Sequence, residues 1–431
     1  MLAAKFHPTK AFVMTTFGCQ YHGKAPSAEK KELIDAFSRL VRTAGVPVEE
    51  YEQEDASIVI PDIPVSDKTN ATGSSTPAKN GTATPPRTGE SPRGHAWLTW
   101  WNTEDDFNTW WATSSVRNFW QSLPETDAGF WRETTIFHDG RTMFETNKET
   151  PNGFGHVGKF CPLGEKTGYW GAYRERLTAS TPIDKLSSAW NASGSRSNSY
   201  DSGYGDGTAS GAAATSVATA EAASCPHLRV GPSGTPETSA ASAPSASATT
   251  SVPAIVPHKI VIKHFPDNLC CVVEGQDRSN MGKREREYWF ENFEDVYNEW
   301  IQTAVFHSSL AKDGIVQARM FHDPNSGAMR SAGFGSSDKR LPLALQHNRL
   351  LQVIYFQDMS YMEKIGRRYA SHLKLRRKFM EAYGPGGDII DGNIVLWVDL
   401  GILKSGGIQA EYIGCYEGSG FMAYRDHQAF T

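Results

Sequence analysis

Hydrophobic positions change between a period of two and a period of three to four along most of the chain, which predicts short strands alternating with amphipathic helices. In the first part, a strand at 11–21 precedes a helix at 28–44. A second strand at 96–102 then precedes a helix around Trp110, and a strand at 168–174 closes this part. The first part is therefore predicted to mix helices with strands.

The later part of the chain repeats this order. A strand at 268–274 leads to a helix at 285–303, a strand at 351–357 leads to a helix at 362–383, and a strand at 410–416 closes the part. Each part has the order strand-helix-strand-strand-helix-strand. The pattern predicts a pseudo-duplicated α+β protein whose antiparallel sheets are flanked by helices.

Two polar segments interrupt the periodic pattern. Residues 61–94 and 191–257 consist mostly of Ser, Thr, Pro, Gly, Ala and Asn, a composition that does not form a packed core. We predict that both are disordered insertions. They divide the chain into an N-terminal half, residues 1–60 with 95–190, and a C-terminal half, residues 258–425.

The overall charge argues against polyanionic partners. The chain has 43 basic and 48 acidic residues and a formal charge of −5, so neither a nucleic acid nor an anionic membrane is the expected partner. No run of about 18 apolar residues occurs, and the first 20 residues lack the pattern of a signal peptide. These features predict a soluble, cytoplasmic protein whose partner is a small molecule.

One histidine stands out by its position. His372 falls on the apolar stripe of the helix predicted at 362–383, so it is expected to face inward. It could be a packed core histidine with a hydrogen-bonded ring, or an axial ligand of haem iron. Six cations on the same helix would suit the carboxylates of a haem, or could form a solvated face: Arg367, Arg368, Lys374, Arg376, Arg377 and Lys378.

Four stretches together resemble a known family. They are Gly168-Tyr-Trp-Gly-Ala-Tyr-Arg-Glu-Arg176, Asp267-Asn-Leu269 with Glu274-Gly-Gln276, Ser371-His-Leu373, and Glu411-Tyr-Ile-Gly-Cys415 followed by Gly420. The chain resembles the haem-containing aldoxime dehydratases over nearly everything outside the two insertions, and most closely the fungal phenylacetaldoxime dehydratases.

This resemblance implies a fold of two ferredoxin-like halves, similar to the dimeric α+β barrels, and a bound haem b. It also implies a lyase that converts R-CH=N-OH into R-C≡N and water at ferrous haem, with an arylalkyl aldoxime as substrate, and it allows a homodimeric state. In that family the substrate nitrogen binds the iron while distal groups move protons, so no net redox change is needed.

The family's site residues can be placed on this sequence. The proximal ligand falls on His372, a distal arginine on Arg176 and a distal glutamate on Glu145. Alternatively, Arg176 could form a surface ion pair with Glu175, and Glu145 could be an exposed loop carboxylate.

Two positions depart from the bacterial pattern. Glu274 stands where those enzymes have a serine, and Val398 stands where they have a distal histidine. We expect Glu274 to take over part of the acid/base work, because a carboxyl group desolvated beside a haem could be protonated near neutral pH. The alternative is that Glu274 caps a turn before Gly275 and has no chemical role.

Three other functions stay open at this point. The protein could be a haem-binding sensor or carrier that has lost dehydratase chemistry, which would agree with Val398. It could use haem as a peroxidase does, although it lacks an evident distal histidine. It could also be a scaffold without haem in which His372 is merely packed.

Overall fold

A computed structural model describes residues 1–54, 92–163, 173–181, 184–188, 253–330 and 342–431. Most of the two predicted insertions lies outside these residues. The ends of the segments do not: residues 93–94 and 255–257, predicted as parts of the insertions, belong to strands.

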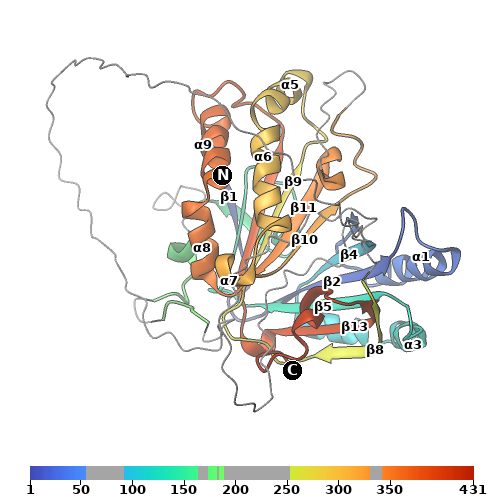
Figure 1. Cartoon of the computed structure of the whole chain (residues 1–431). Helices are drawn as coiled ribbons and strands as arrows, with labels where there is room; N and C mark the ends of the chain where they lie inside the picture. Colours follow the sequence, from blue (N-terminus) through green and yellow to red (C-terminus); the bar gives the residue numbers. More distant parts are fainter. Residues whose placement is uncertain (55–91, 164–172, 182–183, 189–252, 331–341) are drawn as a thin grey trace, which may run out of the picture. The chain divides into compact units, whose positions relative to one another are not determined.

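The described residues form strands and helices in alternation (Figure 1). The strands are β1 Leu2–Lys5, β2 Phe12–Tyr21, β3 Val48–Gln53, β4 Arg93–Trp101, β5 Phe130–Phe137, β6 Thr142–Thr146, β7 Lys159–Pro162, β8 Ile255–Ile262, β9 Cys270–Asp277, β10 Ile315–His322, β11 Arg349–Phe356, β12 Val395–Ile402 and β13 Ile408–Tyr416. The α-helices are α1 Ala28–Arg42, α2 Glu104–Trp111, α3 Ser114–Ser122, α4 Tyr173–Arg176, α5 Lys283–Asn292, α6 Glu294–Ile301, α7 Leu310–Asp313, α8 Met359–Arg368 and α9 Ala370–Tyr383. Short 3-10 helices are η1 Gly153–His156, η4 Leu343–Gln346, η5 Ser405–Gly407 and η6 Gly420–Tyr424, and η3 Gln302–Phe306 is a π-helix.

The thirteen strands of the described residues belong to one antiparallel sheet with the order β7-β1-β6-β12-β9-β11-β10-β3-β4-β2-β5-β13-β8. The α+β class with antiparallel pairing is therefore confirmed. Strands from the first part of the chain, β1, β6 and β7, extend the group that contains β9 to β12, and β8 and β13 from the later part pair beside β5. The division into two pseudo-duplicated halves stays a prediction, because the two parts of the chain exchange strands.

Local sequence explains where individual elements begin. The Ser27 side chain accepts a hydrogen bond from the Lys30 backbone N–H at 3.2 Å and caps α1. Asp358 does the same for α8, accepting from the backbone N–H of Ser360 at 2.8 Å. A carboxylate also stabilises the partial positive charge at a helix N-terminus.

The sheet separates three hydrophobic clusters. An inner cluster combines side chains from both groups of strands, including Trp100, Trp131, Val273 and Trp397. A second cluster lies between β9–β12 and the helices α5, α6, α8 and α9, and a third lies between β2, β4 and the helices α1–α3. Figure 1 shows α8, α9 and α6 on one face of the β9–β11 region. Among the described residues, no helix is long and apolar enough to cross a bilayer.

Several predicted elements differ in detail from the structure. The helix predicted at 285–303 is divided into α5, α6 and part of η3, and the helix predicted at 362–383 is divided into α8 and α9 at Tyr369. The strand predicted at 168–174 lies mostly outside the described residues, and its last two residues belong to helix α4 instead. The strands predicted at 351–357 and 410–416 are confirmed within about two residues.

Candidate active site

The floor of the candidate site is a row of side chains across four neighbouring strands. Glu145 on β6 lies directly opposite Val398 on β12. Val398 in turn lies opposite Glu274 on β9, and Glu274 lies opposite Gln352 on β11. Opposed residues of antiparallel strands project from the same face, and this face packs against α8, α9 and α6. With about 4.8 Å between strands, Glu145 and Glu274 are about 10 Å apart, with Val398 between them.

The roof of the site is built around the break between α8 and α9. Tyr369 has ψ 119°, far from the helical value, so the α-helical ladder stops there. The Gly366 carbonyl accepts a hydrogen bond from the His372 ring through Nδ1 at 3.1 Å. Because that bond puts the proton on Nδ1, the other ring nitrogen, Nε2, keeps its lone pair. The half-buried His372 also contacts the Trp300 ring, with 4.8 Å between ring centroids.

The inward stripe predicted for this helix is confirmed. Met362 and Ile365 are buried in the second cluster, and Tyr369, Phe379 and Tyr383 pack against it. His372 lies on the same face as these residues and lines a cavity. The break at Tyr369 therefore changes the path of the helix without turning the histidine away from the sheet.

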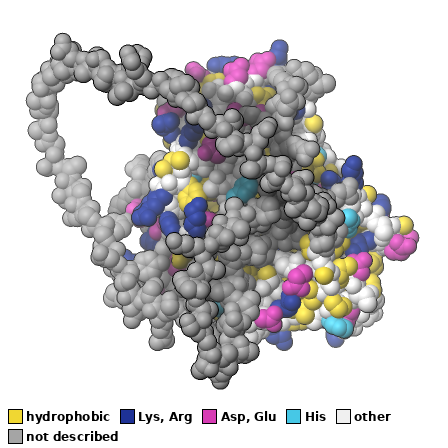
Figure 2. All heavy atoms as spheres, viewed as in Figure 1, with side chains coloured by type: hydrophobic (Ala, Val, Ile, Leu, Met, Phe, Trp, Pro, Cys, Tyr) yellow, Lys and Arg dark blue, Asp and Glu magenta, His cyan; other side chains and the backbone are white. Residues whose placement is uncertain are grey.

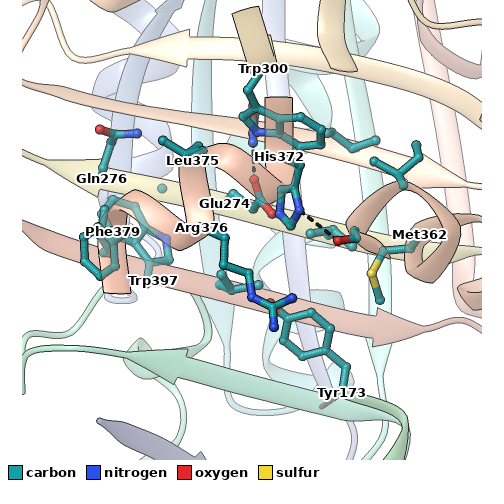
Figure 3. Close-up of a pocket in the computed structure, with 18 of the residues that line it drawn as sticks. Tyr173, Glu274, Gln276, Trp300, Met362, His372, Leu375, Arg376, Phe379 and Trp397 are labelled. Atoms are coloured by element: carbon teal, nitrogen blue, oxygen red, sulfur yellow. Dashed lines mark hydrogen bonds between the residues drawn. The ribbon is translucent and has the colours of Figure 1, made fainter. Parts of the chain in front are cut away.

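Roof and floor enclose a cavity of about 440 Å³ (Figure 3). This volume lies within the range of small-molecule sites, and the walls are mainly apolar and aromatic. His372 and Glu274 both line the cavity, so the structure brings together two of the four residues singled out from the sequence. The aromatic and apolar part of the wall includes Trp289, Tyr297, Trp300, Leu375 and Phe379.

Glu274 is held in place by the neighbouring strand. Its carboxylate accepts a hydrogen bond from the Gln352 side-chain amide, while Gln352 itself is only 1% exposed. Glu274 lies inside β9 and pairs on both sides, so the alternative that it caps a turn before Gly275 is wrong. Gln352 was not singled out from the sequence, although an amide within the apolar run Leu-Leu-Gln-Val-Ile-Tyr-Phe is a signal that could have found it.

Arg176 and Glu145 form an ion pair with each other. Glu145 is fully buried on β6 rather than exposed in a loop, and Arg176 pairs with it rather than with Glu175, so both alternatives are wrong. Neither side chain belongs to the cavity lining, whereas Val398, which lies opposite Glu145 on β12, does. The pair therefore lies beside the cavity, in the same row as Glu274.

Several charged groups lie in the cavity lining or beside it. Arg174 makes two contacts with the Glu363 carboxylate, at 3.0 and 3.1 Å, and so joins α4 to α8. Arg367 and Arg376 line the cavity, and Figure 3 shows the Arg376 guanidinium directed toward the Tyr173 ring. Partial burial lowers the pKa of Arg376, yet an arginine stays charged at neutral pH. Figure 2 shows Lys and Arg side chains beside hydrophobic ones where α8 and α9 lie.

Three buried polar atoms of the cavity residues have no hydrogen-bond partner among the described residues. They are Oε1 of Gln276, Oε1 of Gln352 and Nε1 of Trp397. Buried polar atoms are normally paired, so unpartnered atoms that surround one cavity indicate a site for a ligand.

In the first part of the chain, aromatic rings fill the region between the sheet and the helices α2 and α3. Phe17 packs against Trp110, Trp111 and Trp120 with ring centroids 6.0 to 6.2 Å apart, beneath α2 and α3. Among the described residues, these rings fill the region between helix and sheet there, whereas the region beneath α9 contains the cavity that His372 lines.

A sequence profile described as haem-containing dehydratase matches residues 15–214 and 230–421. The chain belongs to this family. A crystal structure of an aldoxime dehydratase in complex with butyraldoxime is 11% identical, with a TM-score of 0.60, over 98% of this chain and 88% of that chain. A second aldoxime dehydratase crystal structure is 13% identical, also with a TM-score of 0.60, over 98% of this chain and 90% of that chain. At these identities the likeness concerns the fold, and a search of curated proteins returned no match.

The cavity of this haem-containing dehydratase fits the group that gives the family its name. His372 offers a lone pair on Nε2, the apolar walls suit a porphyrin, and Arg367 and Arg376 offer cations for its carboxylates. The described cysteines are free and no C-x-x-C-H motif occurs, so a covalent thioether attachment is not indicated.

Proposed function

We propose that the protein is a haem-dependent lyase that dehydrates arylalkyl aldoximes, such as phenylacetaldoxime, to nitriles and water. The observation that carries this proposal is one cavity in which the Nε2 lone pair of His372 and the carboxyl group of Glu274 come from opposite walls. The cofactor proposed is haem b, whose iron His372 would hold and which would be ferrous in the active form.

The reaction breaks the N–O bond of the oxime and the C–H bond of the neighbouring carbon. A bound haem supplies a Lewis-acidic iron that polarises the N–O bond. Glu274, in its protonated form, gives a proton to the departing hydroxyl oxygen, and its carboxylate then takes the proton from carbon. The protons balance, since the carboxyl group ends as it began and one water leaves.

Gln352 and the ion pair of Arg176 with Glu145 support this role of Glu274. The Gln352 amide fixes one carboxyl oxygen of Glu274, which leaves the other for the substrate. We propose that the Arg176 guanidinium, held by Glu145 beside the cavity, donates a hydrogen bond to the departing oxygen. The catalytic set proposed is thus Glu274, Arg176 and Glu145.

The aromatic wall supports an arylalkyl substrate, because offset or edge-on ring contacts add to the burial of apolar area. Trp289, Tyr297 and Phe379 can surround an aryl ring and exclude water from it. This environment agrees with the resemblance to fungal phenylacetaldoxime dehydratases. A cytoplasmic location and a homodimeric state stay predictions.

The deciding experiment is anaerobic incubation of haem-loaded, dithionite-reduced protein with phenylacetaldoxime. We expect phenylacetonitrile to accumulate with repeated turnover. The His372→Ala variant is the control for cofactor binding, because it removes the proposed iron ligand. Absence of nitrile with several aldoximes, despite a normal ferrous spectrum, would refute the proposed activity.

A haem-binding sensor or carrier is the second candidate, and Val398 favours it. This apolar side chain stands in the middle of the floor, between Glu145 and Glu274, where it can neither donate nor accept a proton. A sensor would bind haem and small gaseous ligands but would leave aldoximes intact. The same incubation therefore separates the two functions.

A further inference from the structure

Gln276 is a buried amide on the floor of the cavity, two residues beyond Glu274. It is 6% exposed and lines the cavity, and its Oε1 has no hydrogen-bond partner among the described residues. Burial raises the pKa of the Tyr297 hydroxyl, and the neighbouring Gln276 side chain offsets part of that rise. An amide lowers the pKa of a hydroxyl from its N–H side, so the unpartnered Oε1 is left for another group.

The surroundings make this acceptor selective. Trp289, Tyr297 and Phe379 line the same cavity, and Figure 3 shows Gln276 and Phe379 on the side of the site away from Met362. When an apolar ligand displaces water from the Gln276 Oε1 atom, this acceptor is left without a hydrogen bond, which costs free energy. A ligand that places an N–H or O–H donor there restores the hydrogen bond. Such a site discriminates against the ligand that lacks the donor.

Spacing along β9 relates this acceptor to the proposed chemistry. Glu274 and Gln276 project from the same face of the strand and are about 7 Å apart along it. A substrate whose oxime hydroxyl lies at Glu274 can therefore extend its ring toward Gln276. The ring edge farthest from the oxime is the part that reaches the amide oxygen.

We propose that Gln276 forms a subsite for an N–H or O–H donor on the aromatic ring of the substrate, so that indolyl and hydroxyphenyl aldoximes are preferred over plain aryl ones. This inference rests on the proposed function, since it names the substrate class of the same site. We expect a preference of about tenfold in kcat/KM, which corresponds to about 1.4 kcal/mol.

The test compares ring pairs that match in size and differ in the donor. One pair is 4-hydroxyphenylacetaldoxime and 4-methylphenylacetaldoxime, and the other is indole-3-acetaldoxime and its benzofuran counterpart. Each is measured with the haem-loaded protein and with Gln276→Met, which keeps the side-chain length and removes the acceptor. Equilibrium affinities of the matching nitriles, measured by calorimetry, give a readout without turnover.

Wild-type protein should prefer the donor-bearing member of each pair about tenfold, in kcat/KM and in nitrile affinity. Gln276→Met should bring both ratios close to one. Gln352→Met is the matched control: it removes the other cavity glutamine and should lower turnover of both members while keeping their ratio.

Equal ratios in the wild-type protein would overturn the inference, and so would a preference that persists in Gln276→Met. The wild-type ratios decide the matter even if the variant does not fold. If no aldoxime yields nitrile, the proposed function is refuted, and the nitrile affinities still decide whether Gln276 selects a donor.

Discussion

Replacing Glu274 by glutamine tests the proposed proton transfer most directly. The two side chains have nearly the same size, and the amide carbonyl oxygen of the new side chain could still accept the hydrogen bond that Gln352 donates. The substitution removes the exchangeable proton and little else. We therefore expect folding and haem binding to persist while turnover is lost.

The size of the effect follows from the role assigned to the carboxyl group. A positioned general acid or base contributes about a hundredfold to ten-thousandfold to a rate. We expect kcat of Glu274→Gln to fall by at least about a hundredfold, which corresponds to about 2.7 kcal/mol of transition-state stabilisation. The free energy of unfolding should change by no more than about 1 kcal/mol, because the hydrogen bond with Gln352 is kept.

The assay is anaerobic nitrile formation from phenylacetaldoxime, with the haem absorption spectrum recorded on the same samples. Glu175→Gln is the matched control, because Glu175 also lines the cavity but is exposed on α4. It makes the same change of charge without removing the proposed acid and should keep most of the activity. Near-normal turnover in Glu274→Gln, with an intact haem spectrum, would refute the acid/base role.

Three further outcomes are expected. His372→Ala should abolish the Soret band of the haem-loaded protein with little change in far-UV circular dichroism, and a band that persisted would place the iron ligand elsewhere. Burial of Asp399 on β12 holds the pKa of its carboxyl group well above its usual range. The folded protein therefore still binds a proton there at pH values above about 4, where the unfolded chain has released it. The folded state loses stability relative to the unfolded chain as pH rises through this range. Relative to wild type, Asp399→Asn should therefore gain stability in urea unfolding between pH 5 and pH 8, and a constant difference would contradict this. Gly275→Ala should lower the free energy of unfolding by about 1 to 3 kcal/mol, because its Cβ would lie 2.0 Å from the buried Trp397 ring. The control is Gly406→Ala, whose Cβ would meet nothing within 4 Å and which should leave the stability nearly unchanged. Equal melting temperatures of the two variants would refute the packing argument.

Periodicity in the sequence predicts the elements that are long and amphipathic. The inward face of the helix with His372 is predicted correctly, because Met362, Ile365 and Phe379 repeat at helical spacing. The break at Tyr369 is not predicted, because the hydrophobic stripe continues through it and neither proline nor glycine marks the position. The hydrogen bond from His372 to the Gly366 carbonyl depends on that break and was missed with it.

The register between distant strands, which brings the site residues together, cannot be predicted from the local patterns of a single sequence. Glu145 and Val398 are opposed across strands that are about 250 residues apart in the chain, and no local pattern reports their pairing. The same holds for the ion pair between Glu145 and Arg176, where the alternative of a surface pairing between Arg176 and Glu175 was wrong. Both pairings join residues that are distant in the chain, whereas the residues themselves were identified from short motifs.

The row across the floor contains two carboxyl groups in different surroundings. Glu145 is fully buried and paired with the Arg176 guanidinium, so its negative charge is already balanced. Glu274 accepts a hydrogen bond from the neutral amide of Gln352 and lines the cavity. Val398 separates the two groups and offers no proton path between them. Of these two carboxyl groups, we therefore expect Glu274 rather than Glu145 to exchange a proton with a ligand that lies over the floor, and the Glu274→Gln variant tests this expectation.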